Sequence, residues 1–157
     1  MFRCLLLCAL LVPLACLAQQ SPSYKTVSLD EVFAEWDATT RTYPPGMSVM
    51  QPQKLRLTAK YVSGPQPCSP RALEIIFNTL GKPAVLKQVS ITNCIKLSSA
   101  AGRPVVAWVQ DVLVPGLNAD VQAGAEIDLR VDLLAYGVGT DRSHNMPYML
   151  VSGFDAH

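Results

Sequence analysis

The amino-acid sequence predicts an α+β fold in which two amphipathic helices pack on a curved antiparallel sheet of about five strands, or on a small, partly open barrel. Two observations support this fold class. Apolar residues recur at helical spacing in two early segments, and they alternate with polar residues at the period of a strand in most of the remaining chain. Glycine- and proline-containing turns separate these segments. We expect residues 28–157 to form this single domain.

The first 18 residues have the layout of a secretory signal peptide. Arg3 precedes a leucine-rich run that is shorter than the roughly 20 residues needed to cross a bilayer, and Ala18 is a small residue suited to cleavage. We therefore expect an exported protein, periplasmic or secreted, without a transmembrane segment. Residues 19–27 are expected to form a flexible N-terminal segment.

Cleavage after the signal peptide would remove three of the five cysteines and leave Cys68 and Cys94. An even pair in an oxidising compartment predicts a disulfide bond. The spacing of these cysteines fits neither a CxxC redox motif nor a zinc site. A lipid anchor at Cys16 is a less favoured alternative, because Pro13 stands where a lipobox has an aliphatic residue.

The first helix is expected over residues 28–39, with Ser28 as N-cap and Glu31 completing a capping box. Residues 41–53 are rich in proline and are expected to be turn and extended chain. From 54 to 61 the apolar period changes to two, which predicts a half-buried strand with a basic outer face. The segment 63–67 is expected to break this strand.

A second helix is expected from Ser69 to Leu80, followed by a stop at Gly81. Four strands should follow, over the ranges 89–97, 105–113, 125–133 and 147–154. The second of these is apolar on both faces, which predicts a central position. The third alternates without error, the segment 114–116 should break the chain before it, and the fourth is expected at the edge of the sheet.

Cys94 poses a geometric problem in the first of these strands. Its side chain falls on the opposite parity from Ile95 and Leu97, where the stripe of the second helix is expected to pack. Two solutions are open. Either a bulge near Asn93 turns the cysteine over, or the disulfide closes around the edge of the strand.

Charge is unevenly distributed, although the whole chain carries a formal net charge of +1. The range 54–103 has eight basic residues and one acidic residue, whereas the range 104–157 has two basic and seven acidic residues. Either neighbouring strands carry complementary charges, or the surface is polarised and steers a charged partner. The small net charge gives no support to nucleic-acid binding.

The candidate binding residues fall into two groups. Arg56, Lys60 and Asp128 lie on the polar parity of two amphipathic strands, where they would face solvent and a charged partner. Asp141, Arg142 and His144 lie in a polar loop that follows two glycines, which would let backbone amides approach a ligand. The alternative for this loop is a solvated connection with local hydrogen bonds.

No pattern predicts catalytic residues, a metal site or a cofactor, so we do not expect an enzyme. We expect an exported, non-catalytic protein that binds a macromolecular partner, either another protein or an envelope component. An envelope accessory factor, an enzyme inhibitor and an immunity protein are examples of this class. The alternative is a small ligand-binding protein or a hydrolase-like enzyme that uses residues 141–145.

Overall fold

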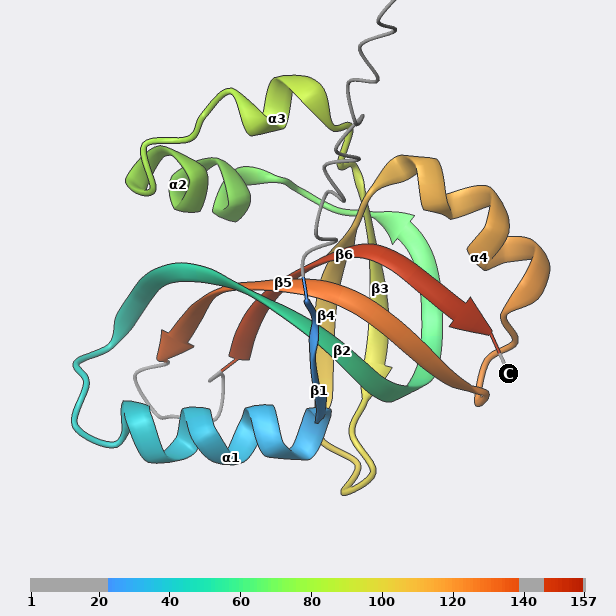
Figure 1. Ribbon diagram of the computed structural model, residues 1–157, viewed down its shortest axis with the longest axis horizontal. Coiled ribbons are helices and arrows are strands. Elements are labelled where there is room, and N and C mark those ends of the chain that lie inside the picture. The colour runs from blue at the N-terminus through green and yellow to red at the C-terminus, as the bar shows by residue number, and fades with distance from the viewer. Residues whose placement is uncertain (1–22, 139–145, 157) are drawn as a thin grey trace, which may run out of the picture.

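The computed structural model describes residues 23–138 and 146–156. In this part of the chain a mixed sheet is formed by β1 (Lys25–Ser28), β2 (Gly46–Pro67), β3 (Asn93–Ser98), β4 (Pro104–Val109), β5 (Glu126–Val138) and β6 (Met146–Ala156). The helical elements are α1 (Leu29–Thr40), α2 (Arg71–Thr79), α3 (Val85–Gln88), the 3₁₀ turn η1 (Asp111–Leu113) and α4 (Val114–Asp120) (Figure 1). No helix in these two ranges is long and apolar enough to span a membrane.

The sheet closes on itself. Its strand order is β1-β2-β3-β4-β6-β5, and β5 pairs in turn with β2, so the strands from β2 to β6 form a ring. The pairs β1–β2 and β4–β6 are parallel, and the other pairs are antiparallel. The prediction of an α+β protein is thus confirmed in outline, but the expected antiparallel sheet of about five strands is a mixed sheet of six.

Strand β2 makes the closure possible because it is 22 residues long and belongs to two parts of the ring. Its residues up to Lys60 pair with β5, and its residues from Lys60 onward pair with β3. Two register shifts between Tyr61 and Gln66 bend the strand at this transition. β2 therefore curves around the ring instead of ending.

The proline-rich segments on either side of residues 54–61 were expected to lie outside the strand, and this prediction is wrong. Pro52 lies inside the register shift between Val49 and Gln53, and Pro65 lies inside the shift between Ser63 and Gln66. A proline lacks the backbone N–H that a regular ladder needs, but a bulge leaves that position unpaired. The strand therefore continues through both prolines.

The first helix follows its prediction closely. Ser28 Oγ accepts the backbone N–H of Glu31 at 3.1 Å, and Glu31 Oε2 accepts the N–H of Ser28 at 2.6 Å. Hydrogen bonds from the backbone N–H and the side chain of Ser28 to the carboxylate lower the pKa of Glu31, since they favour its charged form. The apolar stripe of α1 is buried.

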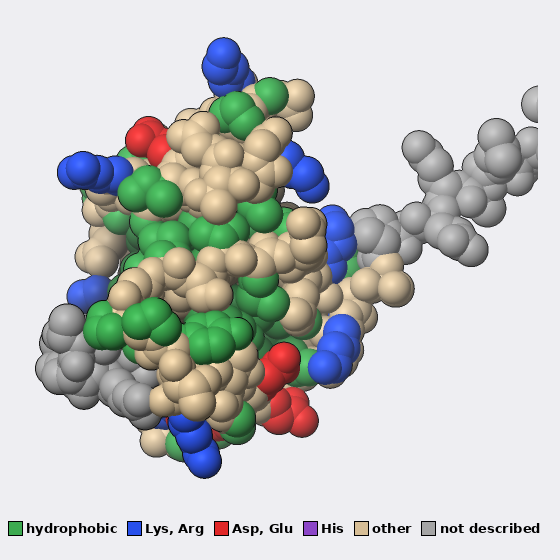
Figure 2. Space-filling view, turned by 90° about the vertical axis from the view of Figure 1, so that its left-hand side faces the viewer, with side chains coloured by type: hydrophobic (Ala, Val, Ile, Leu, Met, Phe, Trp, Pro, Cys, Tyr) green, Lys and Arg blue, Asp and Glu red, His purple; other side chains and the backbone are tan. Residues whose placement is uncertain are grey.

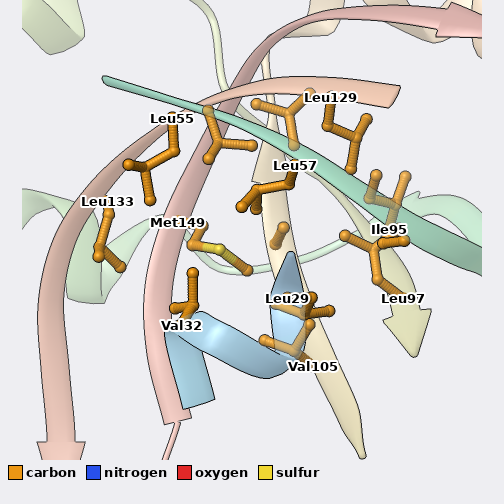
Figure 3. Packing of buried hydrophobic residues seen from close by; sticks show 14 of the residues in the cluster. Leu29, Val32, Leu55, Leu57, Ile95, Leu97, Val105, Leu129, Leu133 and Met149 are labelled. Atoms are coloured by element: carbon orange, nitrogen blue, oxygen red, sulfur yellow. The ribbon is translucent and has the colours of Figure 1, made fainter. Parts of the chain in front are cut away.

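The interior of the ring holds the main apolar core. Leu55 and Leu57 of β2, Leu129 of β5 and Met149 of β6 are buried there together with Leu29 of α1 (Figure 3). Leu117 of α4 belongs to the same cluster. The outward residues of β2, by contrast, are exposed from Lys54 to Lys60. The alternation of apolar and polar residues in β2 therefore predicts correctly which side chains face the inside of the ring and which face the outside.

Three further expectations about the chain's elements are corrected. Residues 25–28 form β1, parallel to β2, instead of a flexible segment. The expected strand over 105–113 ends at Val109, and Val114 begins α4, because a proline is tolerated in the first turn of a helix. β6 is not an edge strand, since it pairs with β5 along one side and with β4 at Leu150 and Val151.

Candidate binding surface

A second apolar cluster lies on the outside of the ring, beneath α2. Leu73, Ile76 and Phe77 of this helix pack with outward-facing residues of the strands, namely Cys94, Trp108, Leu134 and Leu150. Figure 1 shows the α2–α3 layer on one side of the strands and α1 on the other. The ring is therefore covered by apolar contacts on both faces where α2 lies.

This arrangement resolves the problem of Cys94. Its side chain does lie opposite those of Ile95 and Leu97, yet it is only 2% exposed, because α2 covers the outer face. β3 pairs with β4 without a register shift, so neither a bulge in β3 nor a bridge around its edge is needed. The expectation that the second helix packs on the side of Ile95 and Leu97 is wrong.

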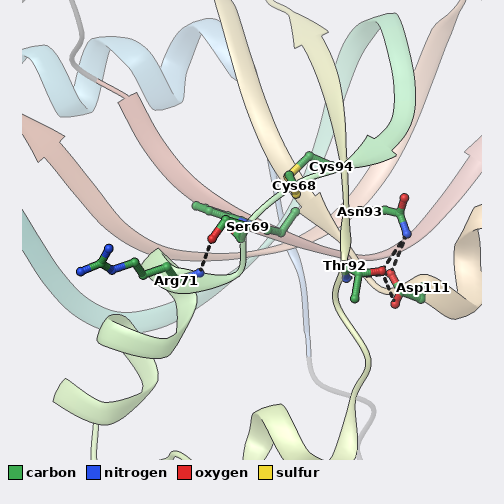
Figure 4. Close-up of a disulfide and its surroundings, with 8 residues drawn as sticks. Cys68, Ser69, Arg71, Thr92, Asn93, Cys94 and Asp111 are labelled. Atoms are coloured by element: carbon green, nitrogen blue, oxygen red, sulfur yellow. Dashed lines mark hydrogen bonds between the residues drawn. A yellow bond between two sulfur atoms is a disulfide. The ribbon is translucent and has the colours of Figure 1, made fainter.

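The predicted disulfide between Cys68 and Cys94 is present, with the two Cα atoms 5.8 Å apart. It joins the residue that follows β2, three positions before α2, to β3 (Figure 4). Beside it, Ser69 Oγ accepts the N–H of Arg71 at 3.3 Å, and Trp108 Nε1 donates to the Ser69 carbonyl at 3.2 Å. These contacts hold the start of α2 against the outer face.

Asp111 fixes the chain that leads from α3 into β3. Its carboxylate accepts hydrogen bonds from the N–H and hydroxyl of Thr92, both at 2.9 Å, and from the Asn93 amide at 3.0 Å (Figure 4). It also accepts the Ser90 hydroxyl at 2.6 Å. Burial disfavours the charged form of this carboxylate, but the hydrogen bonds outweigh burial and hold the pKa of Asp111 well below its usual range. The group is a structural anchor.

Replacing Asp111 with asparagine is expected to lower the unfolding free energy at neutral pH by about 1–3 kcal/mol. The NH₂ group of asparagine would replace one carboxylate oxygen, and it cannot accept the hydrogen bonds that this oxygen receives. A carboxyl whose pKa is depressed by folding stabilises the protein above its unfolded pKa of about 3.9, and this stabilisation is lost as the pH falls further. The stability difference between wild type and Asp111→Asn should therefore shrink below that pH. Urea unfolding at several pH values measures it, and a difference independent of pH would contradict the assignment.

Beyond the part covered by α2, the outer face is open. In the β3–β4 register, Cys94 faces Trp108 under the helix, and Lys96 faces Val106 in the next outward pair. There a groove of about 370 Å³ crosses the surface, lined mainly by apolar side chains. We call it the outer groove, and its exposed or partly exposed lining residues are Val62, Lys96, Pro104, Val106 and Met146.

Three features of this face bear on what it can bind. Val62 is 44% exposed and lies within the bent part of β2. Trp108 and Tyr148 stack on each other with centroids 5.7 Å apart, and Trp108 is buried, so this pair offers little free ring surface. Figure 2 shows further hydrophobic side chains gathered beneath the α2–α3 layer.

The charges on β2 and β5 largely neutralise each other. Arg56 lies 3.1 Å from Asp128 and 3.3 Å from Asp155, and Arg130 also contacts Asp155 at 3.3 Å. Burial raises the pKa of Asp132, and its register partner Lys54 opposes this rise. Complementary pairing between neighbouring strands therefore accounts for this part of the charge pattern.

The basic residues between 61 and 110 are differently placed. Arg71, Lys82, Lys87 and Lys96 form no ion pair with any residue in the described ranges, whereas Arg103 is paired with Asp37 of α1 at 2.6 Å. We call these four the basic group. Between residues 61 and 110 the only acidic residue is Glu74. The α2–α3 layer and the neighbouring part of β3 thus carry excess positive charge.

The predicted binding residues do not come together as one site. Arg56 and Asp128 face outward as expected, but they bind each other. Lys60 lines a separate polar cleft. Asp141, Arg142 and His144 lie outside the described residues, as do the signal peptide and Cys16, so the predictions that rest on them remain predictions.

The sequence pattern did not lead to a prediction of the outer groove. Val106 could have indicated it, because this apolar residue lies on the outward face of a strand that is apolar on both faces. Such a pattern predicts that both faces are covered, and the structure shows that α2 covers only one part of the outer face. The described ranges contain no group of three or more histidine, cysteine or acidic residues that could hold a metal ion.

Comparisons of the chain with protein-family models, curated proteins and solved structures find no match.

Proposed function

We propose that the protein is an exported, non-catalytic binding protein that docks a protein partner on the outer groove. The partner would present an apolar segment flanked by carboxylates. One observation carries this proposal: the apolar outer face continues past α2 into an open groove that contains Lys96, which forms no ion pair with any described residue. Exposed apolar surface with a polar rim is typical of protein interaction sites.

The groove has an apolar lining and one positive charge, so its partner should have both apolar and acidic side chains. Val62, Val106 and Met146 would lose water against an apolar segment, which is favourable by about 25 cal/mol per Å² of apolar surface buried. Lys96 would remain unpaired under a purely apolar partner, and a buried unpaired charge is costly. A carboxylate next to the apolar segment removes this cost, and the rest of the basic group would speed the encounter.

Small barrels of five strands bind ligands on a comparable face in other proteins. Counted from β2, the closed order of the ring is 1-2-3-5-4. OB-fold proteins, which are five-stranded Greek-key barrels, bind oligonucleotides and oligosaccharides on the face of strands 2 and 3, and the second and third strands of the present ring are β3 and β4. Such a likeness concerns the fold, and the choice of partner depends on the groove's side chains.

Those side chains favour a protein over a nucleic acid. Binding of single strands on such barrels relies on aromatic rings that stack with bases. In the present groove the lining is aliphatic, and the nearby Trp108 is stacked on Tyr148 and hydrogen-bonded to Ser69. The disulfide fits an oxidising compartment, in agreement with the proposed export.

Defined peptides test the proposal. We expect a labelled peptide of alternating leucine and glutamate to bind the protein in a fluorescence-anisotropy titration, and a leucine–lysine peptide to bind more weakly. Lys96→Glu should weaken binding of the acidic peptide by about five- to tenfold, because an ion pair is replaced by a repulsion. The matched control, Lys25→Glu, reverses a charge on an exposed lysine of β1 that does not line the groove, and it should change binding less than about twofold.

Two results would overturn the proposal. One is equal binding of the two peptides, with no difference between Lys96→Glu and the control. The other is tight binding of a serine–glutamate peptide or of single-stranded DNA, because a partner recognised by charge alone would not need the apolar lining. Val106→Asp separates these cases further, since it removes apolar character while leaving Lys96 in place.

A further inference from the structure

A second concave site lies beside Lys60, at the end of the stretch of β2 whose outward residues are exposed. It is a cleft of about 440 Å³ where the β1–α1 junction meets β2, the turn between β3 and β4, and the beginning of β5. We call it the polar cleft. The polar side chains around it belong to Ser28, Asp30, Thr58, Lys60, Ser99 and Glu126. Its volume lies in the range of small-ligand sites.

Half of these polar groups are already engaged. Ser28 Oγ accepts the N–H of Glu31, Thr58 donates to Asp128 at 2.6 Å, and Ser99 Oγ accepts the N–H of Arg103 at 3.3 Å. These hydroxyls therefore shape the cleft and leave the charged groups to bind a ligand.

The charged groups of the cleft have few partners among the described residues. Lys60 and Glu126 are direct partners in the β2–β5 register, yet they form no ion pair with each other or with any other described residue. One oxygen of Asp30 accepts the N–H of Ala101 at 3.3 Å, which holds the carboxylate at the cleft, and its other oxygen has no partner in the described ranges. The cleft thus offers one ammonium and two carboxylates.

This combination restricts the charge of a ligand. Lys60 would repel a simple cation, and the carboxylates of Asp30 and Glu126 would repel a simple anion. A neutral sugar would leave all three charges without a counterion. A molecule with both an ammonium and a carboxylate can satisfy each group, with its ammonium toward Asp30 and Glu126 and its carboxylate toward Lys60.

We infer that the polar cleft binds a small zwitterion, a free peptide of two or three residues with both termini unblocked. This site is separate from the outer groove, which is lined by a different set of residues. Because Lys60 and Glu126 are exposed, water screens their charges, and each ion pair adds little free energy. The expected dissociation constant is therefore on the order of 1 mM.

The test uses L-alanyl-L-alanine as probe in an NMR titration of the ¹⁵N-labelled protein. We expect saturable shifts of the amides of Asp30, Lys60 and Glu126. Capping the amino end with acetyl, or the carboxyl end as an amide, should each weaken binding by about fivefold, since each removes one charge. Lys60→Gln should weaken binding of the unblocked dipeptide to a similar extent and should no longer distinguish it from the amide.

Lys87→Gln is the matched control, because it removes the charge of an exposed lysine on α3 that does not line the cleft. It should leave dipeptide binding unchanged, as should Lys96→Glu, so failure here is distinguishable from failure of the outer groove. The inference is overturned if both capped dipeptides bind as well as the free one, or if Lys60→Gln and Lys87→Gln behave alike. Saturable binding of glucose at the same amides would also overturn it.

Discussion

Replacing Gly64 with alanine is expected to lower the unfolding free energy by about 2–4 kcal/mol, as the sum of backbone strain and overpacking. Gly64 lies in the bent part of β2 with φ of +120°, a conformation that residues with a Cβ rarely adopt. A Cβ there would lie 2.9 Å from the carbonyl oxygen of Cys94 and 2.9 Å from the Cα of Ile95. Both atoms belong to the backbone of β3, which cannot move without disturbing the ladder.

Gly124 provides the matched control for this variant. Its φ is +91°, but a Cβ at this position would meet nothing within 4 Å. Gly124→Ala should therefore show only the cost of the backbone conformation, about 1–2 kcal/mol. Urea unfolding of the oxidised proteins measures both losses. Equal losses at the two positions would show that contact with β3 does not limit position 64.

The second large effect is expected from the disulfide. Removing the bridge with the pair Cys68→Ser and Cys94→Ala should destabilise the protein by about 3 kcal/mol, since it frees a loop between cysteines 26 positions apart in the unfolded chain. Alanine is used at position 94 because Cys94 is buried in the apolar cluster beneath α2, where a serine hydroxyl would lack a partner.

Thermal melting with and without a reductant measures this effect. The melting temperature of the wild-type protein should fall on reduction, and that of the double variant should not change. A wild-type melting temperature that does not change when the thiols are shown to be free would contradict the prediction. The variant should keep the outer groove, because Lys96 and Val106 remain paired through the β3–β4 ladder.

The parts of the fold that the sequence could predict are those determined by local periodicity. The capping box at Ser28 and the alternation through Leu55 and Leu129 depend on near neighbours in the chain, and the structure has them as expected. The closure of the ring depends instead on pairing between β2 and β5, which are distant in sequence. No local pattern predicts such a pairing. Pro52 and Pro65 indicated breaks in the strand, but both lie in bulges, so β2 is longer than expected.

The functional surface was harder to predict for a related reason. Arg56 and Asp128 were chosen because they are charged and face outward, but their closeness neutralises them, and only the register between two strands reveals it. Lys96 has the same sequence character as Arg56. It differs because its cross-strand partner is Val106 and not an acid, and it forms no ion pair in the described ranges.

The pairing of β2 with β5 also sets an order of events during folding. Gly46 at the start of β2 pairs with Val138 at the end of β5, so the ring cannot close until almost the entire chain has been made available. Contacts of such long range carry a large entropic cost before they are formed, which slows folding. A chain that crosses a membrane unfolded, N-terminus first, would present β2 long before β5 arrives. β1 and α1 precede β2 directly, and β1 pairs with residues Leu55–Thr58, so they can shelter one edge of β2 during this interval while the edge that awaits β5 stays open to other strands.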